Sequence, residues 1–194
     1  MILKGGALIC TALFFMVDTA MIIHKDFNRK LKRDYFFITG KFDIDCNYFI
    51  EKIKKGCEDK SNRNFQTHIK GNMTSFTYFL KDPILRKHLL QMIAHLDKHE
   101  YDLPMYQLAE AWGFETRFGG KTRFHSHAGA IVAGVIYFSE CNQPLIFKEI
   151  DEKVYPAPGV FALFTPWLNH GCEISFDERS KFGVSFNMLE AFDW

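Results

Sequence analysis

The chain has 194 residues, of which 47% are hydrophobic and 24% charged, a composition typical of one soluble globular domain. Its formal net charge of +1 gives no electrostatic reason to expect nucleic acid or a membrane surface as a partner. The five cysteines are an odd number without a CxxC pair, which argues against a disulfide framework and favours a reducing, cytoplasmic location.

An apolar run, GGALICTALFFMV at residues 5–17, lies near the start of the chain. It is too short for a membrane span, which needs about 20 residues, so an internal strand or helix is favoured over a signal peptide or an anchor. The basic stretch at residues 24–35 is interpreted as a connection between this N-terminal piece and the rest of the chain. We therefore treat residues 1–40 as an N-terminal extension of a single domain, 1–194, and leave its role open.

A first helix is predicted in residues 41–104, a region expected to support the rest of the fold. It runs from about Cys46 to Lys55 and places Ile50, Ile53 and Phe49 on one face.

A second helix is the clearest element of the chain. Asp82 suits the N-cap, and Pro83 suits the first helical position, where its missing N–H costs nothing. His88, His95 and His99 on or just past this helix are interpreted as surface or cap residues, because no partner is spaced to share a ligand with them. The apolar side chains recur at three- and four-residue spacing: Leu85, Leu89, Met92 and Leu96.

Residues 105–190 have a different sequence pattern from the helical region before them. Short β-branched or aromatic runs alternate there with turn signals, a pattern that predicts a β-sandwich or barrel. The expected fold is therefore α+β and mainly β, with helices first and a β-rich half second. The runs are YQLAEAWGFETRF, AIVAGVIYF, QPLIFKEI, GVFALFTP and KFGVSFNML.

Three histidines in this half are candidate metal ligands. In RFHSHAG, residues 123–129, a strand would direct His125 and His127 to the same face. His170 follows a later apolar strand and its turn, in FALFTPWLNHGCE. Such a set leaves positions open on a metal, which suits a catalytic site better than a structural one. On the local pattern alone, unrelated imidazoles remain an alternative.

The ordered motifs FGGKTRFHSHAG, AGVIYFS, YPAPGVFALFTPWLNHG and KFGVSFNM resemble those of the double-stranded β-helix oxygenases that use Fe(II) and 2-oxoglutarate. They are most similar to oxygenases related to prolyl hydroxylases. The resemblance implies a jelly-roll or cupin-like core buttressed by helices from the N-terminal half. It also implies that His125, His127 and His170 bind the metal. Most of the superfamily has Asp or Glu where His127 stands, so a metal other than iron stays open.

The resemblance further implies a cation for the distal carboxylate of 2-oxoglutarate. Lys181, at the start of the last predicted strand, is favoured, and Arg179 is the rival because related enzymes use an arginine at slightly shorter spacing. Tyr137 matches a position where related hydroxylases place a phenol against that carboxylate; a core tyrosine is the alternative. Trp112 and Trp167 are interpreted as packing residues, with lining of the substrate mouth as the alternative.

The leading functional hypothesis from this resemblance is an Fe(II)- and 2-oxoglutarate-dependent dioxygenase. It would consume O2, with ascorbate as a further candidate cofactor, and hydroxylate a C–H bond while releasing succinate and CO2. The substrate would be a protein side chain or a small metabolite. Two alternatives are a three-histidine cupin-type dioxygenase that does not use 2-oxoglutarate and a non-catalytic metal-binding β-barrel module. The sequence leaves the oligomeric state open.

Overall fold

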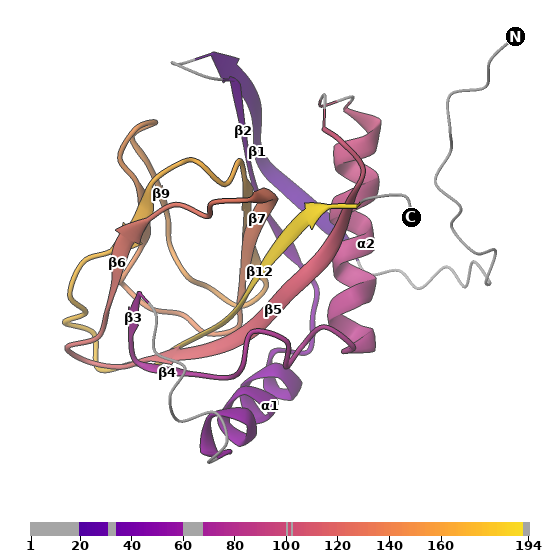
Figure 1. Cartoon of the computed structure of the whole chain (residues 1–194). Helices are drawn as coiled ribbons and strands as arrows, with labels where there is room; N and C mark the ends of the chain where they lie inside the picture. The colour runs from indigo at the N-terminus through magenta and orange to yellow at the C-terminus, as the bar shows by residue number, and fades with distance from the viewer. Residues whose placement is uncertain (1–19, 31–33, 60–67, 100, 102, 192–194) are drawn as a thin grey trace, which may run out of the picture.

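A computed structural model describes residues 20–30, 34–59, 68–99, 101 and 103–191 of the chain (Figure 1). The apolar run at 5–17 lies outside these residues. Two antiparallel sheets make up most of the fold, and the predicted mainly β, jelly-roll class is confirmed. No helix in the described part of the chain is long and apolar enough to cross a membrane.

The larger sheet has seven strands in the order β1-β2-β10-β7-β12-β5-β4. Every run of residues predicted to be a strand after position 105 contributes to one of the two sheets. The bounds are β1 (Met21–Lys30), β2 (Asp34–Phe42), β10 (Val160–Phe164), β7 (Ala130–Tyr137), β12 (Lys181–Glu190), β5 (Tyr106–Thr116) and β4 (Asn72–Met73).

The smaller sheet has five short strands and faces the larger one (Figure 1). Aromatic side chains fill the space between them: the Phe147 ring from the smaller sheet meets the Phe164 ring from the larger one, with their centroids 4.8 Å apart. The strand order and bounds are β3 (Ile69–Lys70), β6 (Lys121–His125), β11 (His170–Cys172), β8 (Leu145–Phe147) and β9 (Glu152–Val154).

Both predicted helices are confirmed. Helix α1 (Cys46–Glu58) is capped by Asp45, whose side chain accepts a hydrogen bond from the Tyr48 amide at 3.1 Å. Helix α2 (Pro83–Lys98) is capped by Asp82 in the same way, with the Leu85 amide 2.8 Å from the carboxylate. Each cap satisfies an amide that the first helical turn leaves unpaired.

The larger sheet has two distinct faces because side chains alternate along its strands. One face packs against α1 and α2 (Figure 1) and forms an apolar core with them. The other face turns toward the smaller sheet and forms the interior of the barrel. On β7, Val132 and Ile136 belong to the helix-covered core, whereas Val135 and Tyr137 belong to the interior.

The interpretation of residues 24–35 as a connection is wrong. Most of that stretch lies in β1 and β2, which pair antiparallel and place Phe27 opposite Phe37. β2 also pairs with β10, so the hairpin completes one end of the larger sheet. The stretch looked like a linker because β1 is an edge strand, whose solvent side tolerates charged side chains.

The histidines of α2 need a similar correction. His88 is buried, with its ring centroid 4.7 Å from that of Phe42, and burial lowers the pKa of its imidazole. His95 is mostly covered and lies 2.6 Å from the Asp26 carboxylate of β1. The partner was not recognised because it comes from a strand far away in the sequence.

Candidate metal centre

Three imidazoles meet at one end of the barrel interior. His125 ends β6, His170 opens the neighbouring strand β11, and the two residues lie directly opposite each other. The ring centroids are 4.6 Å apart for His125 and His170, 4.9 Å for His125 and His127, and 5.0 Å for His127 and His170. One nitrogen from each ring lies within 4.8 Å of the others, close enough for a shared metal ion.

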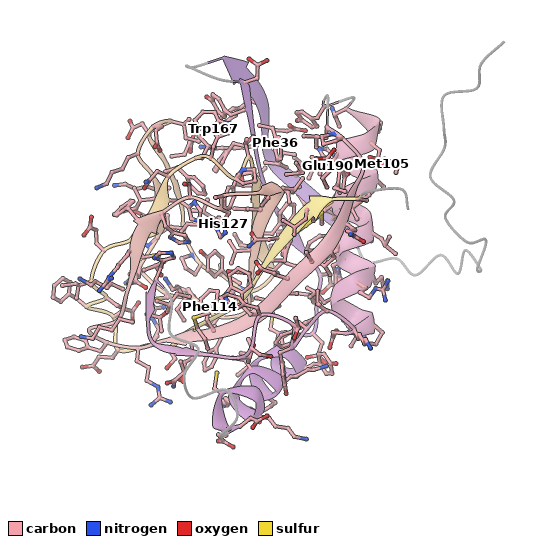
Figure 2. The ribbon with its side chains drawn as sticks, viewed as in Figure 1. Phe36, Met105, Phe114, His127, Trp167 and Glu190 are labelled. Atoms are coloured by element: carbon pink, nitrogen blue, oxygen red, sulfur yellow. The ribbon has the colours of Figure 1, made fainter. Side chains whose placement is uncertain are left out.

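His127 reaches this cluster differently from the expectation that it shares a strand face with His125. β6 ends at His125, so His127 belongs to the loop after that strand. Its amide donates to the Pro166 carbonyl at 2.9 Å, which holds the loop against the segment before His170. Figure 2 shows His127 and Phe114 between the two sheets, with Trp167 farther out near β2. The Nε2 atoms of His127 and His170 are 3.2 Å apart.

Backbone carbonyls fix the tautomer of two of these rings. The Nδ1 of His125 lies 2.8 Å from the Arg123 carbonyl, and the Nδ1 of His170 lies 2.8 Å from the Leu168 carbonyl. A carbonyl only accepts hydrogen bonds, so each Nδ1 carries the proton and each Nε2 keeps its lone pair. This arrangement prepares Nε2 as the metal-binding atom.

The three imidazoles are neutral at physiological pH. Burial is the main cause, and it lowers the pKa of His170 to about 3, that of His127 to about 4, and that of His125 below its usual value. A neutral imidazole binds a metal ion without first losing a proton.

A fourth imidazole, missed in the sequence, lies against this cluster. The His68 ring stacks on that of His125, with centroids 4.3 Å apart and planes 21° apart, and it lines the same pocket. His68 precedes β3 and has no motif around it, so no sequence signal distinguished it from a surface histidine. Its contact restricts how the His125 ring can turn.

The pocket beneath the histidines contains a buried lysine. Lys181 is 1% exposed, and its Nζ donates to the Cys172 Sγ at 3.2 Å. No acidic side chain lines this pocket, and none pairs with Lys181 among the residues that the structure describes. An ammonium group that is removed from water and lacks a counter-charge is costly. The pocket is therefore electrostatically suited to an anion.

Two further hydrogen-bond donors line the same pocket. Tyr137 lies opposite Gly183 on β12, and burial holds the pKa of its phenol well above the usual value, so the phenol stays protonated. Trp112 lies opposite Ser185, and its buried indole N–H has no hydrogen-bond partner in the described part of the chain. The structure thus places Trp112 in the pocket lining.

Arg179 lies outside this pocket. Its guanidinium is on the surface, where it pairs with Asp177 at 2.7 Å and with Glu140 at 3.0 Å. Its charge is therefore already balanced by two carboxylates. Of the two candidate cations, the structure brings only Lys181 into the pocket beneath the histidines.

Sequence comparisons give no relative: no protein-family model and no curated protein matches the chain. Solved structures do match. The viral collagen prolyl hydroxylase of Paramecium bursaria Chlorella virus-1, in its 2-oxoglutarate complex, has a TM-score of 0.65 and 11% identity over 80% of this chain and 96% of that one. A Pseudomonas putida prolyl-4-hydroxylase has a TM-score of 0.60 and 11% identity, covering 80% and 93%.

HygX from Streptomyces hygroscopicus, solved with nickel and 2-oxoglutarate, has a TM-score of 0.59 and 11% identity, with coverage of 80% of this chain and 83% of that one. The resemblance to Fe(II)- and 2-oxoglutarate-dependent oxygenases is thus confirmed at the level of the fold. At such low identity, the role of each side chain in this chain has to be argued from its own surroundings.

Proposed function

We propose that the chain is an Fe(II)- and 2-oxoglutarate-dependent dioxygenase that hydroxylates a C–H bond of a protein side chain or a small metabolite. The observation that carries this proposal is the burial of Lys181. The lysine is buried in the same pocket as the three imidazoles, and the pocket has no carboxylate of its own. A dianionic ligand that binds a metal at one end and Lys181 at the other satisfies both groups.

The donor set fits the metal. His125, His127 and His170 would hold Fe(II) through neutral nitrogens, which suits imidazole ligation and leaves positions for other ligands. These ligands bring no negative charge, so the two carboxylates of 2-oxoglutarate would offset two of the three positive charges of Fe(II) and Lys181. When bound, Fe(II) and 2-oxoglutarate supply oxygen activation coupled to decarboxylation of the cosubstrate to succinate and CO2.

The chain itself contributes binding, orientation and the exclusion of water. Lys181, assisted by the phenol of Tyr137 and the indole of Trp112, would bind the distal carboxylate. The apolar side chains of Phe114, Phe164 and Leu145 line the rest of the pocket and keep water away from the reacting centre. Arg179 takes no part in this scheme.

The matched structures are consistent with this proposal and keep both substrate classes open. HygX has also been solved with hygromycin B, a small molecule, with a TM-score of 0.58 and 11% identity. A prolyl hydroxylase from Trichoplax adhaerens has been solved with a peptide fragment of hypoxia inducible factor, with a TM-score of 0.56 and 10% identity.

One observation favours a second candidate, a three-histidine cupin-type dioxygenase that does not use 2-oxoglutarate. The ligand set has no carboxylate, which is the expected set for that class. This alternative gives Lys181 no task, however, and leaves its buried charge unexplained.

The proposal is tested by decarboxylation of 2-oxoglutarate labelled at C1, the carboxylate next to the keto group. The metal content of the protein is measured at the same time. We expect Fe(II)-dependent release of labelled CO2. In Lys181→Ala this release should fall sharply at limiting 2-oxoglutarate, although the metal content is unchanged. Bound iron without CO2 release would favour the cupin-type alternative. A tightly bound zinc ion without any turnover would favour a non-catalytic module.

A further inference from the structure

A second group of metal-binding side chains lies on the outside of the fold, where β1 packs near the end of α2. We propose that Asp26, His95 and His99 form a site for a divalent transition metal of the zinc class, which joins the β1–β2 hairpin to α2. The site is separate from the barrel pocket, and the proposal does not depend on the proposed function.

The spacing of the two histidines suits a shared ligand. His95 and His99 are four residues apart, and the His99 amide still bonds the His95 carbonyl at 3.2 Å, so the helical repeat continues to His99. Residues at this spacing lie on one side of a helix. Their ring centroids are accordingly 4.3 Å apart.

Asp26 brings the third donor from β1. Its Oδ2 lies 2.6 Å from the Nε2 of His95 and 3.9 Å from the Nε2 of His99. Ligands at zinc bond lengths in a tetrahedron are separated by about 3.3 Å. The His95–Asp26 contact would therefore lengthen and the His99–Asp26 contact would shorten, each by less than about 1 Å.

Tyr101 holds the carboxylate in place. Its phenol donates to the Oδ1 of Asp26, the oxygen that does not contact the histidines. Burial, reinforced by Asp26, raises the pKa of Tyr101, so the phenol remains a donor and does not compete as a ligand. The Tyr101 ring packs on that of Phe36, with centroids 5.2 Å apart, which ties this support to the core.

The accessibility of the donors suits a metal that exchanges with solvent. The side chains of His95 and Asp26 are 14% and 18% exposed, whereas that of His99 is 45% exposed. Asp26, His99 and Tyr101 also line a surface pocket, through which water can complete the coordination. Two imidazoles and one carboxylate are the ligands that zinc prefers, whereas calcium and magnesium prefer oxygen alone.

A bound ion would anchor an exposed part of the fold. β1 is the edge strand of the larger sheet and has β2 as its only strand partner among the described residues. A metal bound by both β1 and α2 would stabilise that edge, because the binding free energy adds to the stability of the folded state. The alternative is a hydrogen-bonded cluster of His95, Asp26 and Tyr101 that binds no metal.

Zinc binding to protein without an affinity tag distinguishes a metal site from a hydrogen-bonded cluster that binds no metal. We expect two Zn²⁺ equivalents per wild-type chain by equilibrium dialysis, and one in the double variant His125→Ala/His170→Ala. Removing a hydrogen-bond partner of a metal ligand weakens binding by about 10- to 100-fold, so losing a ligand should cost at least about a hundredfold. His99→Gln or Asp26→Asn should therefore abolish the second equivalent, both in the double variant and in the otherwise unaltered chain.

Glu51→Gln, which alters an exposed carboxylate on α1, is the matched control and should leave both equivalents in place. Thermal unfolding gives a second readout: Zn²⁺ should raise the melting temperature of the double variant but not that of the same protein with Asp26→Asn. The proposal is overturned if Asp26→Asn and His99→Gln leave zinc stoichiometry and zinc-dependent stabilisation unchanged. It is also overturned if wild type binds a single equivalent that His125→Ala/His170→Ala removes.

Discussion

The two faces of the larger sheet differ although the same strands build both. On β12, Phe182, Val184 and Phe186 turn toward the helices and are buried in an apolar core. Lys181 and Ser185, on the same strand, turn toward the barrel pocket. The β12 side chains on the helix-covered face are apolar. The pocket face instead has a buried cation without a carboxylate partner and an indole N–H without a hydrogen-bond partner among the described residues.

This difference separates stability from binding along a single strand. Burial of apolar area on the helix-covered face stabilises the fold. Burial of Lys181 and of the Trp112 N–H on the other face opposes folding unless a ligand supplies the missing interactions. Substitutions on alternate residues of β12 should therefore have opposite kinds of effect.

The largest expected effect lies in the pocket. His170→Ala should abolish Fe(II) binding and turnover, because a ligand is lost, while the fold is retained because the residue sits at a strand end. Fe(II) binding, 2-oxoglutarate decarboxylation and the circular dichroism spectrum would be measured together. His127→Asp is the companion variant and should keep metal binding and measurable turnover, since it restores the commoner ligand. Wild-type metal affinity in His170→Ala would refute the assignment.

On the helix-covered face, Phe186→Ala should lower the free energy of unfolding by about 3 to 5 kcal/mol. The ring is fully buried and packs against Gly134 of β7, so its loss leaves a cavity. Urea unfolding measures the effect, and Ser185→Ala on the opposite face is the matched control with a much smaller cost. Similar losses in the two variants would contradict the division of roles between the faces.

Lys181→Ala should weaken 2-oxoglutarate binding about a hundredfold, because breaking a buried charge pair costs about 3 kcal/mol or more. Stability without cosubstrate should be unchanged or higher, since a buried cation without a carboxylate partner is removed. Titration of 2-oxoglutarate into the Fe(II)-loaded protein and urea unfolding of the metal-free protein measure the two effects. Arg179→Ala is the control and should change the affinity by less than about threefold. A large loss in Arg179→Ala alone would assign the anchor to Arg179.

The smallest effect concerns pH. The pKa of His127 is lowered to about 4 in the fold, whereas an unfolded histidine titrates near 6.5. Below about pH 6.5 the unfolded chain therefore takes up a proton that the folded chain does not, so stability falls as the pH is lowered toward 4. Between pH 7 and pH 5 we expect the metal-free protein to lose about 2 kcal/mol through this residue. Urea unfolding at both values should show a smaller loss in His127→Gln.

Much of the fold could be predicted because its strongest patterns are local. The helix cap Asp82 and the apolar runs of β7 and β12 depend on neighbouring residues, and their elements form where the pattern indicates. β1 could not be predicted in the same way, because an edge strand has one face and one side in solvent and therefore lacks a clear alternation.

The candidate sites divide along the same line. His125, His127 and His170 were recognisable because ordered motifs surround them, and the structure brings them together. His68 and the contact between Asp26 and His95 depend only on tertiary packing, so no spacing in the sequence indicated them. The surroundings of Lys181, above all its burial beside Cys172, could be read only from the structure.

The position of β2 between β1 and β10 has a consequence for folding. Ile38 pairs with Leu163, across most of the described chain, so a strand made early in synthesis waits for a partner made late. Contacts between residues so far apart in the sequence are slow to form, because a long loop must close before the contacts stabilise the fold. Until β10 leaves the ribosome, β2 can pair only with β1, and the edge of β2 that β10 covers in the fold stays open. The nascent chain is therefore most exposed to aggregation during this interval and should gain most from chaperones that shield hydrophobic strands.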